Sequence, residues 1–426
     1  MSAYKINDPH SDENRNATAE AKVCECLERI DERDAEIGAW EVVDREGALR
    51  QAKTRDQSAD RGLLHGIPIG VKDIIDVCGL PTRMGTPIYA ANVAGADAAC
   101  VALARAAGAV VLGKTVTTEL AVFHPGKTRN PRNPEHTPGG SSSGSAAAVA
   151  AGMVPMALGT QTAGSVIRPA SYCGIVGFKP SFGIIPRAGI KSQSESLDTV
   201  GLMANSVEDV ALFAAGISGD REINISIESA HAPRVPRIGV CRTHEWDQAD
   251  NDTEQAIDTA ASRFAGHGAH ITQTELPAPF AGLCAAQKDI QLFEAARAYA
   301  FEYETHRDRL STRLRELLDE GRSISWPRYR AALKLAIQCR AMISDIFRHV
   351  DVLLMPSAPG CAPHGLQSTG DPVFNRIGTV LHLPCITLPG LRGSNGMPVG
   401  IQLIGPFSGD AMTLRAAHWA QPVLLR

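Results

Sequence analysis

Two serines and one lysine in this chain are of the types that nucleophilic catalysis uses. Ser141 lies in the glycine-rich segment 139–144 (GGSSSG), and Ser165 lies in a second turn of small residues farther along. Lys72 lies in an apolar run, 67–75 (IPIGVKDII). Lysine can replace histidine as the base that activates a serine nucleophile. The three residues therefore indicate a hydrolase of the serine–lysine kind.

The surroundings of Lys72 favour a base over an ordinary surface lysine. Isoleucine and valine dominate the segment, and Gly66 and Gly79 bound it, which predicts a strand over 67–77. Burial in such a strand disfavours the charged ammonium and lowers the lysine pKa, so the neutral amine can accept a proton. Asp73 follows directly but alternates to the other face of the strand, so it need not pair with Lys72.

The turn before Ser165 suits the stabilisation of an oxyanion. Residues 160–165 (TQTAGS) are small and turn-prone. Successive backbone N–H groups in such a turn can point into one concavity and hold developing negative charge. Glycine and alanine let a substrate carbonyl approach the backbone closely.

Segment 139–144 has two other interpretations. Glycine–serine tracts are often flexible linkers, but this one is short and opens directly into an alanine-rich helix predicted at 146–151. The segment also matches G-x-S-x-G, the nucleophile elbow of another hydrolase class. That elbow follows a hydrophobic strand, whereas the polar segment 132–138 (RNPEHTP) precedes this one. Both interpretations are therefore disfavoured.

The elements that must position these residues predict an α/β fold. A strand at 67–77, a helix at 97–108 and a strand at 109–113 follow one another, an order that favours a largely parallel sheet. Two helices are predicted within 17–55, and 283–348 is expected to be almost entirely helical. We predict a disordered tail at 1–16 and one large α/β/α domain over 17–426.

Composition narrows the class of protein. The chain has 426 residues, 44% hydrophobic and 21% charged, which is ordinary for a globular enzyme, and its formal net charge of −4 gives no electrostatic case for nucleic acid. No apolar run approaches the ~18 residues that span a bilayer. The ten scattered cysteines and the polar N-terminus predict reduced thiols and a cytoplasmic location. His267 and His270 lack a third ligand, so no metal is expected. No cofactor is expected either.

A longer pattern joins the two serine turns. It runs over 139–180 (GGSSSGSAAAVAAGMVPMALGTQTAGSVIRPASYCGIVGFKP) and is supported by 66–73 (GIPIGVKD), with weaker matches at 113–119, 130–133 and 396–405. In these segments the chain resembles the amidase signature family, over residues 20 to 420. The resemblance implies one α/β/α domain with a mixed, mostly parallel central sheet, and a substrate pocket shaped by 283–348.

The resemblance also implies roles for the motif residues. Ser165 would be the nucleophile, Ser141 a bridging serine that follows a cis peptide bond, and Lys72 the base. Ser142 would support the relay, or be only a turn residue. The expected oxyanion donors are the backbone N–H groups of Thr162, Ala163, Gly164 and Ser165.

The motif departs from the commoner family pattern at three places. Gln161 stands where aspartate is usual, Ala163 stands where glycine is usual, and the arginine falls at Arg168, one position later. The stretch 161–169 (QTAGSVIRP) is similar to the malonamidase-like branch, where this arginine holds a substrate carboxylate. Arg168 is therefore a candidate carboxylate clamp. The alternative is a buried arginine that ties loops together through backbone carbonyls.

These observations predict an amidohydrolase that cleaves a small linear amide, with a carboxylate-bearing amide such as malonamate as one candidate. We expect the protein to bind a small-molecule amide substrate and neither nucleic acid nor a membrane. The resemblance implies a possible homodimer. A carbamate or aryl-amide hydrolase of the same family is an alternative. Another is a glutaminase subunit of an amidotransferase, which would need a partner chain. A binding protein without activity is disfavoured by the intact set of Lys72, Ser141 and Ser165.

Overall fold

A computed structural model describes residues 17–122, 124–224 and 234–425. Within these ranges, eleven strands form one sheet in the order β1-β3-β2-β4-β6-β5-β10-β11-β9-β7-β8. The predicted tail, 1–16, lies outside the described residues. The strands are β1 (Trp40–Val43), β2 (Pro68–Lys72), β3 (Val110–Thr115), β4 (Met156–Gln161), β5 (Val176–Lys179), β6 (Thr199–Ala204), β7 (Arg237–Val240), β8 (His270–Gln273), β9 (Val352–Pro356), β10 (Cys385–Arg392) and β11 (Pro398–Ile404).

The sheet mixes parallel and antiparallel neighbours. At one end β3, β2 and β4 are parallel, and at the other end β9, β7 and β8 are parallel. The pairings from β4 through β6, β5, β10 and β11 to β9 are antiparallel, as is β1 with β3. The expectation of a mixed sheet is confirmed, but the expectation that most of it is parallel is wrong. Only a short turn joins β10 to β11, and such a connection permits antiparallel pairing alone.

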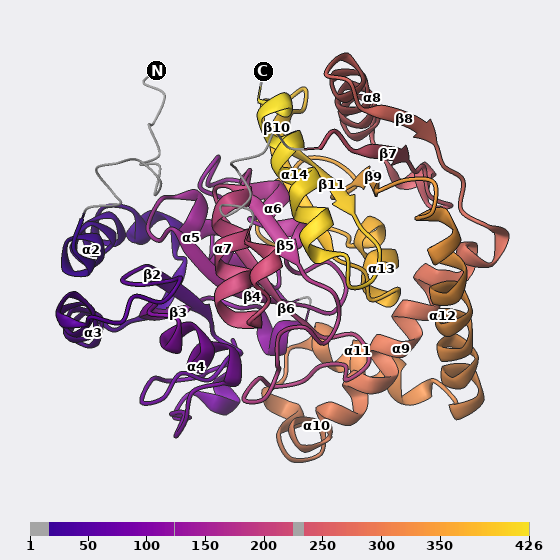
Figure 1. Cartoon of the computed structure of the whole chain (residues 1–426). Helices are drawn as coiled ribbons and strands as arrows, with labels where there is room; N and C mark the ends of the chain where they lie inside the picture. The colour runs from indigo at the N-terminus through magenta and orange to yellow at the C-terminus, as the bar shows by residue number, and fades with distance from the viewer. Residues whose placement is uncertain (1–16, 123, 225–233, 426) are drawn as a thin grey trace.

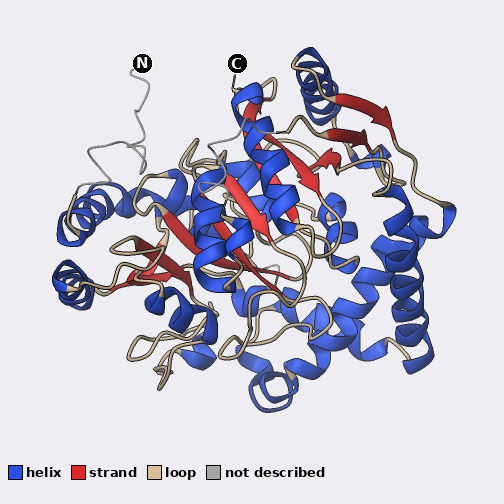
Figure 2. Cartoon of the chain, viewed as in Figure 1, coloured by secondary structure: helices blue, strands red, loops and turns tan. Residues whose placement is uncertain are grey.

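Helices pack on both faces of the sheet, which gives the expected three layers (Figures 1 and 2). Helices α7 and α14 contact β6 and β10, and α5 and α6 contact β4 and β11. The described helices are α2 (Ala19–Ile37), α3 (Arg45–Gln57), α4 (Ala99–Ala106), α5 (Ser143–Ala150), α6 (Ile167–Cys173), α7 (Val207–Ser218), α8 (Asn251–Gly266), α9 (Leu283–Ala298), α10 (Ala300–His306), α11 (Thr312–Ser323), α12 (Trp326–Ile346), α13 (Val373–Val380) and α14 (Asp410–Leu424).

The region 283–348 is helical as predicted. It consists of α9 to α12, which gather at one side of the molecule in the orange part of Figure 1. Helix α9 packs against α11 and α12 and also reaches α13, which lies beside the serine turns. This arrangement brings a sequence-distant helix next to the motif residues.

Two local predictions need correction. The segment 17–55 contains strand β1 between its two helices, and β1 pairs with β3 at the sheet edge. The strand predicted over 67–77 ends at Lys72 because the N–H groups of Ile74 and Ile75 both turn back to the Lys72 carbonyl. The strand end therefore presents the lysine at the start of a turn.

Two further observations concern the cysteines and the helices. All ten cysteines lie within the described ranges and are unpaired, and six of them are buried. Of the helices in the described ranges, none is both long and apolar enough to cross a membrane.

Candidate active site

Lys72 occupies the end of β2 with a fully buried side chain. Its Nζ donates hydrogen bonds to Ser141 Oγ at 2.7 Å and to Thr160 Oγ1 at 2.8 Å. Burial lowers the lysine pKa from its ordinary 10.5 to about 7, although the Asp198 carboxylate opposes this shift. Near neutral pH a large fraction of the amine is therefore uncharged and can accept a proton from a hydroxyl group.

Asp73 pairs with another lysine, which agrees with the prediction that it need not serve Lys72. Lys114 Nζ lies 2.9 Å from Asp73 Oδ1, and both side chains are buried. Asp73 Oδ2 also accepts hydrogen bonds from the backbone N–H groups of Arg83 and Met84. The buried pair fixes the turn that follows β2 and leaves the Lys72 amine directed at hydroxyl groups.

Ser141 lies in a buried turn immediately before α5. Gly139 has φ +80°, and a Cβ atom there would lie 2.9 Å from the Cα atom of Pro169, so the position requires glycine. The peptide bond between Gly140 and Ser141 is cis, as the family resemblance implies. The linker interpretation is wrong because the turn packs against α6 and is buried along its length.

Ser142 supports the site through the backbone of β4. Its hydroxyl donates to the Thr160 carbonyl at 3.3 Å and accepts from the Thr160 N–H at 3.3 Å. These bonds hold Thr160 beside Lys72. Thr160 was not among the residues predicted from the sequence, and its only local signal is its place at the start of the small-residue turn.

Ser165 lies half-buried on a narrow pocket that Ser141 and Arg168 also line. The structure therefore brings Ser141, Ser165 and Arg168 together on one pocket. Within the described part of the chain, no protein group accepts a hydrogen bond from the backbone N–H groups of 162–165. These donors remain available to a substrate oxygen, and their role as an oxyanion hole stays a prediction.

Gln161 and Gly164 hold the loop 162–165 in place. Gln161 Oε1 accepts from the N–H groups of Val166 and Ile167 at 2.9 and 3.1 Å, at the start of α6. A Cβ atom at Gly164 would lie 2.3 Å from Asn375 Oδ1, so glycine lets α13 pack directly on the loop. The glutamine found in place of the usual aspartate thus serves as an uncharged acceptor at the helix start.

Arg168 makes the loop-tying contacts that one of its two interpretations predicts. The side chain is buried, and its Nη2 donates to the Gly140 carbonyl at 2.6 Å and to Thr369 Oγ1 at 3.3 Å. Its Nε and Nη1 find no hydrogen-bond partner among the described residues. Burial lowers the pKa of this guanidinium to about 10. Arg168 therefore ties the Ser141 turn to a neighbouring loop, and two of its buried nitrogens keep no hydrogen-bond partner among the described residues.

Asp198 is a second residue of the site that was not predicted from the sequence. Its carboxylate accepts from Thr162 Oγ1 at 2.6 Å, from Ser192 Oγ at 3.2 Å, and from the N–H groups of Gln193 and Ser194. Burial raises the Asp198 pKa. The residue ties the loop 162–165 to the segment 192–194.

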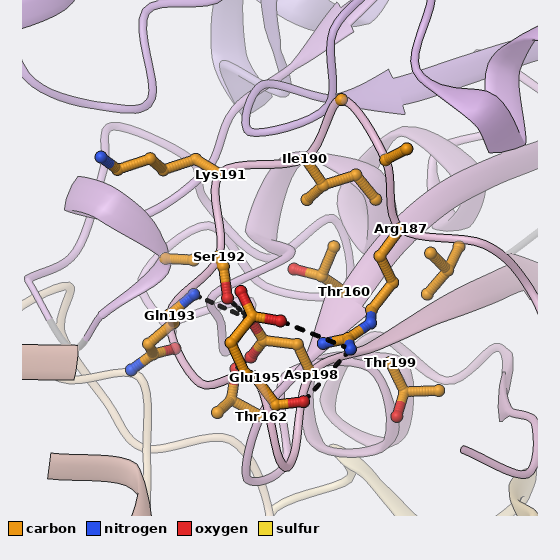
Figure 3. Close-up of a pocket in the computed structure, with 14 residues that line it drawn as sticks. Thr160, Thr162, Arg187, Ile190, Lys191, Ser192, Gln193, Glu195, Asp198 and Thr199 are labelled. Atoms are coloured by element: carbon orange, nitrogen blue, oxygen red, sulfur yellow. Dashed lines mark hydrogen bonds and ion pairs between the residues drawn. The ribbon is translucent and has the colours of Figure 1, made fainter. Parts of the chain in front are cut away.

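A larger cavity, of about 410 Å³, adjoins the narrow pocket (Figure 3). Thr160, Thr162 and Asp198 form its inner wall, and the segment 187–193 forms much of the rest. Ala121 lines both the cavity and the narrow pocket, so the two spaces meet there. As for metals, the described residues hold no cluster of three or more histidine, cysteine or acidic side chains arranged to bind one.

Lys72 is buried and hydrogen-bonded to Ser141, and Ser141 and Ser165 line one pocket. This arrangement is typical of serine hydrolases that cleave amides. The chain belongs to the Amidase family, whose model matches residues 21–414. It is accordingly a hydrolase that acts on amide C–N bonds.

The similarity to relatives and to solved structures covers nearly the whole chain. A glutamyl-tRNA(Gln) amidotransferase subunit from Roseiflexus castenholzii is 34% identical, covering 93% of this chain and 91% of that protein. Its counterpart from Koribacter versatilis is 30% identical, with 96% of each chain covered. A crystal structure of an amidase superposes with a TM-score of 0.87 at 29% identity, covering 96% of this chain and 97% of that one.

A further structure has the same fold. It is described as a vestigial protein complex that reveals the evolutionary origins of an s-triazine catabolic enzyme. The TM-score is 0.88 at 28% identity, with 96% of each chain covered. The large α/β domain with its mixed sheet is thus the architecture of solved amidase structures.

Proposed function

We propose that this amidase hydrolyses a small linear amide whose acyl part carries a carboxylate, as in malonamate. The observation that carries the proposal is the buried Arg168 guanidinium, whose Nε and Nη1 have no partner among the described residues. Leaving buried donors unpaired costs ~1–3 kcal/mol each. A substrate carboxylate would accept a charge-assisted hydrogen bond from Nη1, and the pocket that Arg168 shares with Ser165 is narrow enough to favour a short acyl chain.

The proposed mechanism follows from the placement of the three catalytic residues. The neutral Lys72 amine takes the proton of Ser141, and Ser141 takes the proton of Ser165. Ser165 Oγ then attacks the amide carbonyl, and the N–H groups of 162–165 stabilise the oxyanion. The proton returns through Ser141 to the leaving nitrogen, the C–N bond breaks, and water hydrolyses the acyl-enzyme.

The test compares two substrates that differ only in charge. Ammonia release from malonamate is measured beside release from its uncharged methyl ester, with Ser165→Ala as the blank. A strong preference for malonamate supports the carboxylate contact and the malonamidase-like assignment. Equal rates, or activity on the neutral compound alone, would discard it and favour a carbamate or aryl-amide hydrolase.

A second candidate is a glutaminase component of an amidotransferase, and the relatives named as glutamyl-tRNA(Gln) amidotransferase subunits favour it. Glutamine also carries a carboxylate, but the chain between this group and the attacked carbonyl is two carbon atoms longer than in malonamate. This candidate predicts ammonia release from glutamine and a stable complex with a partner chain. An active lone polypeptide in gel filtration that ignores glutamine would exclude it.

A further inference from the structure

The cavity of about 410 Å³ has a definite position relative to the proposed catalytic residues. Thr160 accepts the second hydrogen bond of Lys72 and lines this cavity, so the cavity begins one side chain away from the proposed base. Arg168 and both serines line the narrow pocket instead. The two spaces meet at Ala121.

The chemistry divides the substrate between these two spaces. The acyl part lies toward Arg168, and the leaving nitrogen must lie where Ser141 can protonate it. A substituent on that nitrogen would extend past Ala121 toward Thr160. A molecule the size of water or ammonia occupies ~30 Å³. The cavity is thus an order of magnitude larger than ammonia requires.

Two of the four charged residues on the cavity wall, Asp198 and Lys191, already have strong partners. Asp198 accepts four hydrogen bonds. Lys191 Nζ lies 2.6 Å from the fully buried Glu302 carboxylate and over the Tyr299 ring. Arg187 differs, because its carboxylate partner, Glu195, is 3.7 Å away with a side chain that is 79% exposed.

Arg187 Nη2 also donates to the Glu195 carbonyl at 3.1 Å, so only the contact with the Glu195 carboxylate is weak, and that contact can be exchanged at little cost. Exposed ion pairs contribute only ~0–1 kcal/mol, so a bound carboxylate can replace Glu195. Figure 3 shows the Arg187 side chain extending toward Glu195 and Asp198 on the cavity wall. A guanidinium in this position offers a fork of donors that matches a carboxylate.

We propose that this cavity is an amine-side subsite, which accepts the leaving group of an N-substituted amide, and that Arg187 binds a carboxylate on that leaving group. The proposal rests on the proposed function. In the reaction the Ser165 Oγ–acyl bond forms and the C–N bond breaks. The leaving nitrogen takes its proton from Ser141 and departs as an amino acid, and water then releases the acyl part as an acid.

The experiment uses three substrates with the same malonyl group: malonamate, N-methylmalonamate and N-malonylglycine. We expect kcat/KM for N-malonylglycine to exceed that for N-methylmalonamate by about tenfold or more, as a charge-assisted contact allows. Arg187→Met should remove this preference by raising KM and leave malonamate turnover unchanged. Glu195→Gln should strengthen the preference, because it frees Arg187. Arg45→Met, which removes a surface arginine paired with Asp31, should change nothing.

The outcomes separate the subsite from the proposed function. If malonamate is hydrolysed but the glycine compound has no advantage over the methyl compound, the subsite is overturned and the function stands. The same holds if Arg187→Met affects malonamate and N-malonylglycine equally. If none of the three is hydrolysed and the Ser165→Ala protein does not bind N-malonylglycine in calorimetry, both proposals are overturned.

Discussion

The Thr162 hydroxyl donates a 2.6 Å hydrogen bond to the Asp198 carboxylate. Thr162 begins the proposed oxyanion loop after β4, and Asp198 immediately precedes β6, the antiparallel neighbour of β4. The contact therefore couples the position of the loop to the register of two central strands. The same carboxylate raises the Lys72 pKa, so one buried group acts on both the loop and the base.

Asp198→Asn should reduce activity and also move its pH dependence. We expect kcat to fall about tenfold, because the Thr162 hydroxyl loses a charge-assisted hydrogen bond that contributes ~1.5–3 kcal/mol. Removing the negative charge also removes a contribution that raises the Lys72 pKa, so the rising limb of kcat/KM should move to lower pH.

The measurement is a pair of pH–rate profiles for the wild type and Asp198→Asn. Asp209→Asn gives a control in the next helix, where Ser206 caps α7 and donates its hydroxyl to the Asp209 carboxylate at 2.7 Å. If Asp198→Asn lowered the rate without moving the pH profile, Asp198 would have only a structural role and would not affect the pKa of Lys72.

The sequence predicts the catalytic candidates better than the contacts that arrange them. Lys72 in an apolar run, and two serines in small-residue turns, are local signals of burial and of turn formation. Asp198 has no such signal, and Thr160 has only its place at the start of the small-residue turn, because their roles arise when β4 pairs with β6 and β2 pairs with β4.

The sheet follows the same rule. The strand–helix–strand order at 67–113 correctly predicts parallel neighbours at that end. The antiparallel centre depends on pairings such as β5 with β10, which join residues far apart in the chain. Local patterns contain no information on such pairings, and this is why the expectation of a mostly parallel sheet is wrong although the sheet is mixed as expected.

The pH dependence of the wild-type enzyme should report the buried lysine. With a pKa of about 7, Lys72 is protonated and inactive as a base at pH 5.5 and mostly neutral at pH 8. We therefore expect kcat/KM to rise with pH and level off above an apparent pKa near 7. Initial rates of ammonia release between pH 5 and 9 provide the measurement. A flat profile over this range would argue against Lys72 as the base.

Lys72 should also make the stability of the protein depend on pH. The folded pKa, about 7, lies below the ordinary 10.5, so between these values the unfolded chain binds more protons than the folded one. The free energy of unfolding contributed by this group therefore rises with pH across that window. Lys72→Met should be more stable than the wild type at pH 7, with a Tm advantage that shrinks toward pH 10. Thermal unfolding of both proteins at several pH values checks this, and an advantage independent of pH would contradict it.

Arg168→Lys should separate carboxylate binding from loop anchoring. Lysine retains the charge but not the fork of donors, so we expect KM for malonamate to rise about 10- to 100-fold. The rate on the methyl ester should change by less than about threefold, because that substrate makes no charged contact. Steady-state kinetics on both compounds provide the measurement.

A structural arginine provides the matched control for Arg168. Arg132 donates to the Cys173 and Gly174 carbonyls at 2.8 and 3.2 Å, at the end of α6. Arg132→Lys should affect the two substrates equally. If Arg168→Lys also lowered activity on malonamate and on the methyl ester equally, the role of Arg168 would be limited to its hydrogen bond with the Gly140 carbonyl.

Ser165→Ala and Ser142→Ala should have different effects on activity and stability. Ser165 lines the pocket, whereas the Ser142 hydroxyl bonds to the backbone of Thr160. Removing the nucleophile should lower kcat by at least about 10⁴-fold with little change in Tm, since Ser165 is half-buried. Ser142→Ala should cost about 1 kcal/mol of stability through its two lost bonds to Thr160, and lower kcat by less than about a hundredfold. Acylation by a reactive ester, followed by mass spectrometry, adds a readout at the nucleophile itself. Ser142→Ala should still be labelled and Ser165→Ala should not, and a Ser165→Ala protein with normal turnover would refute the mechanism.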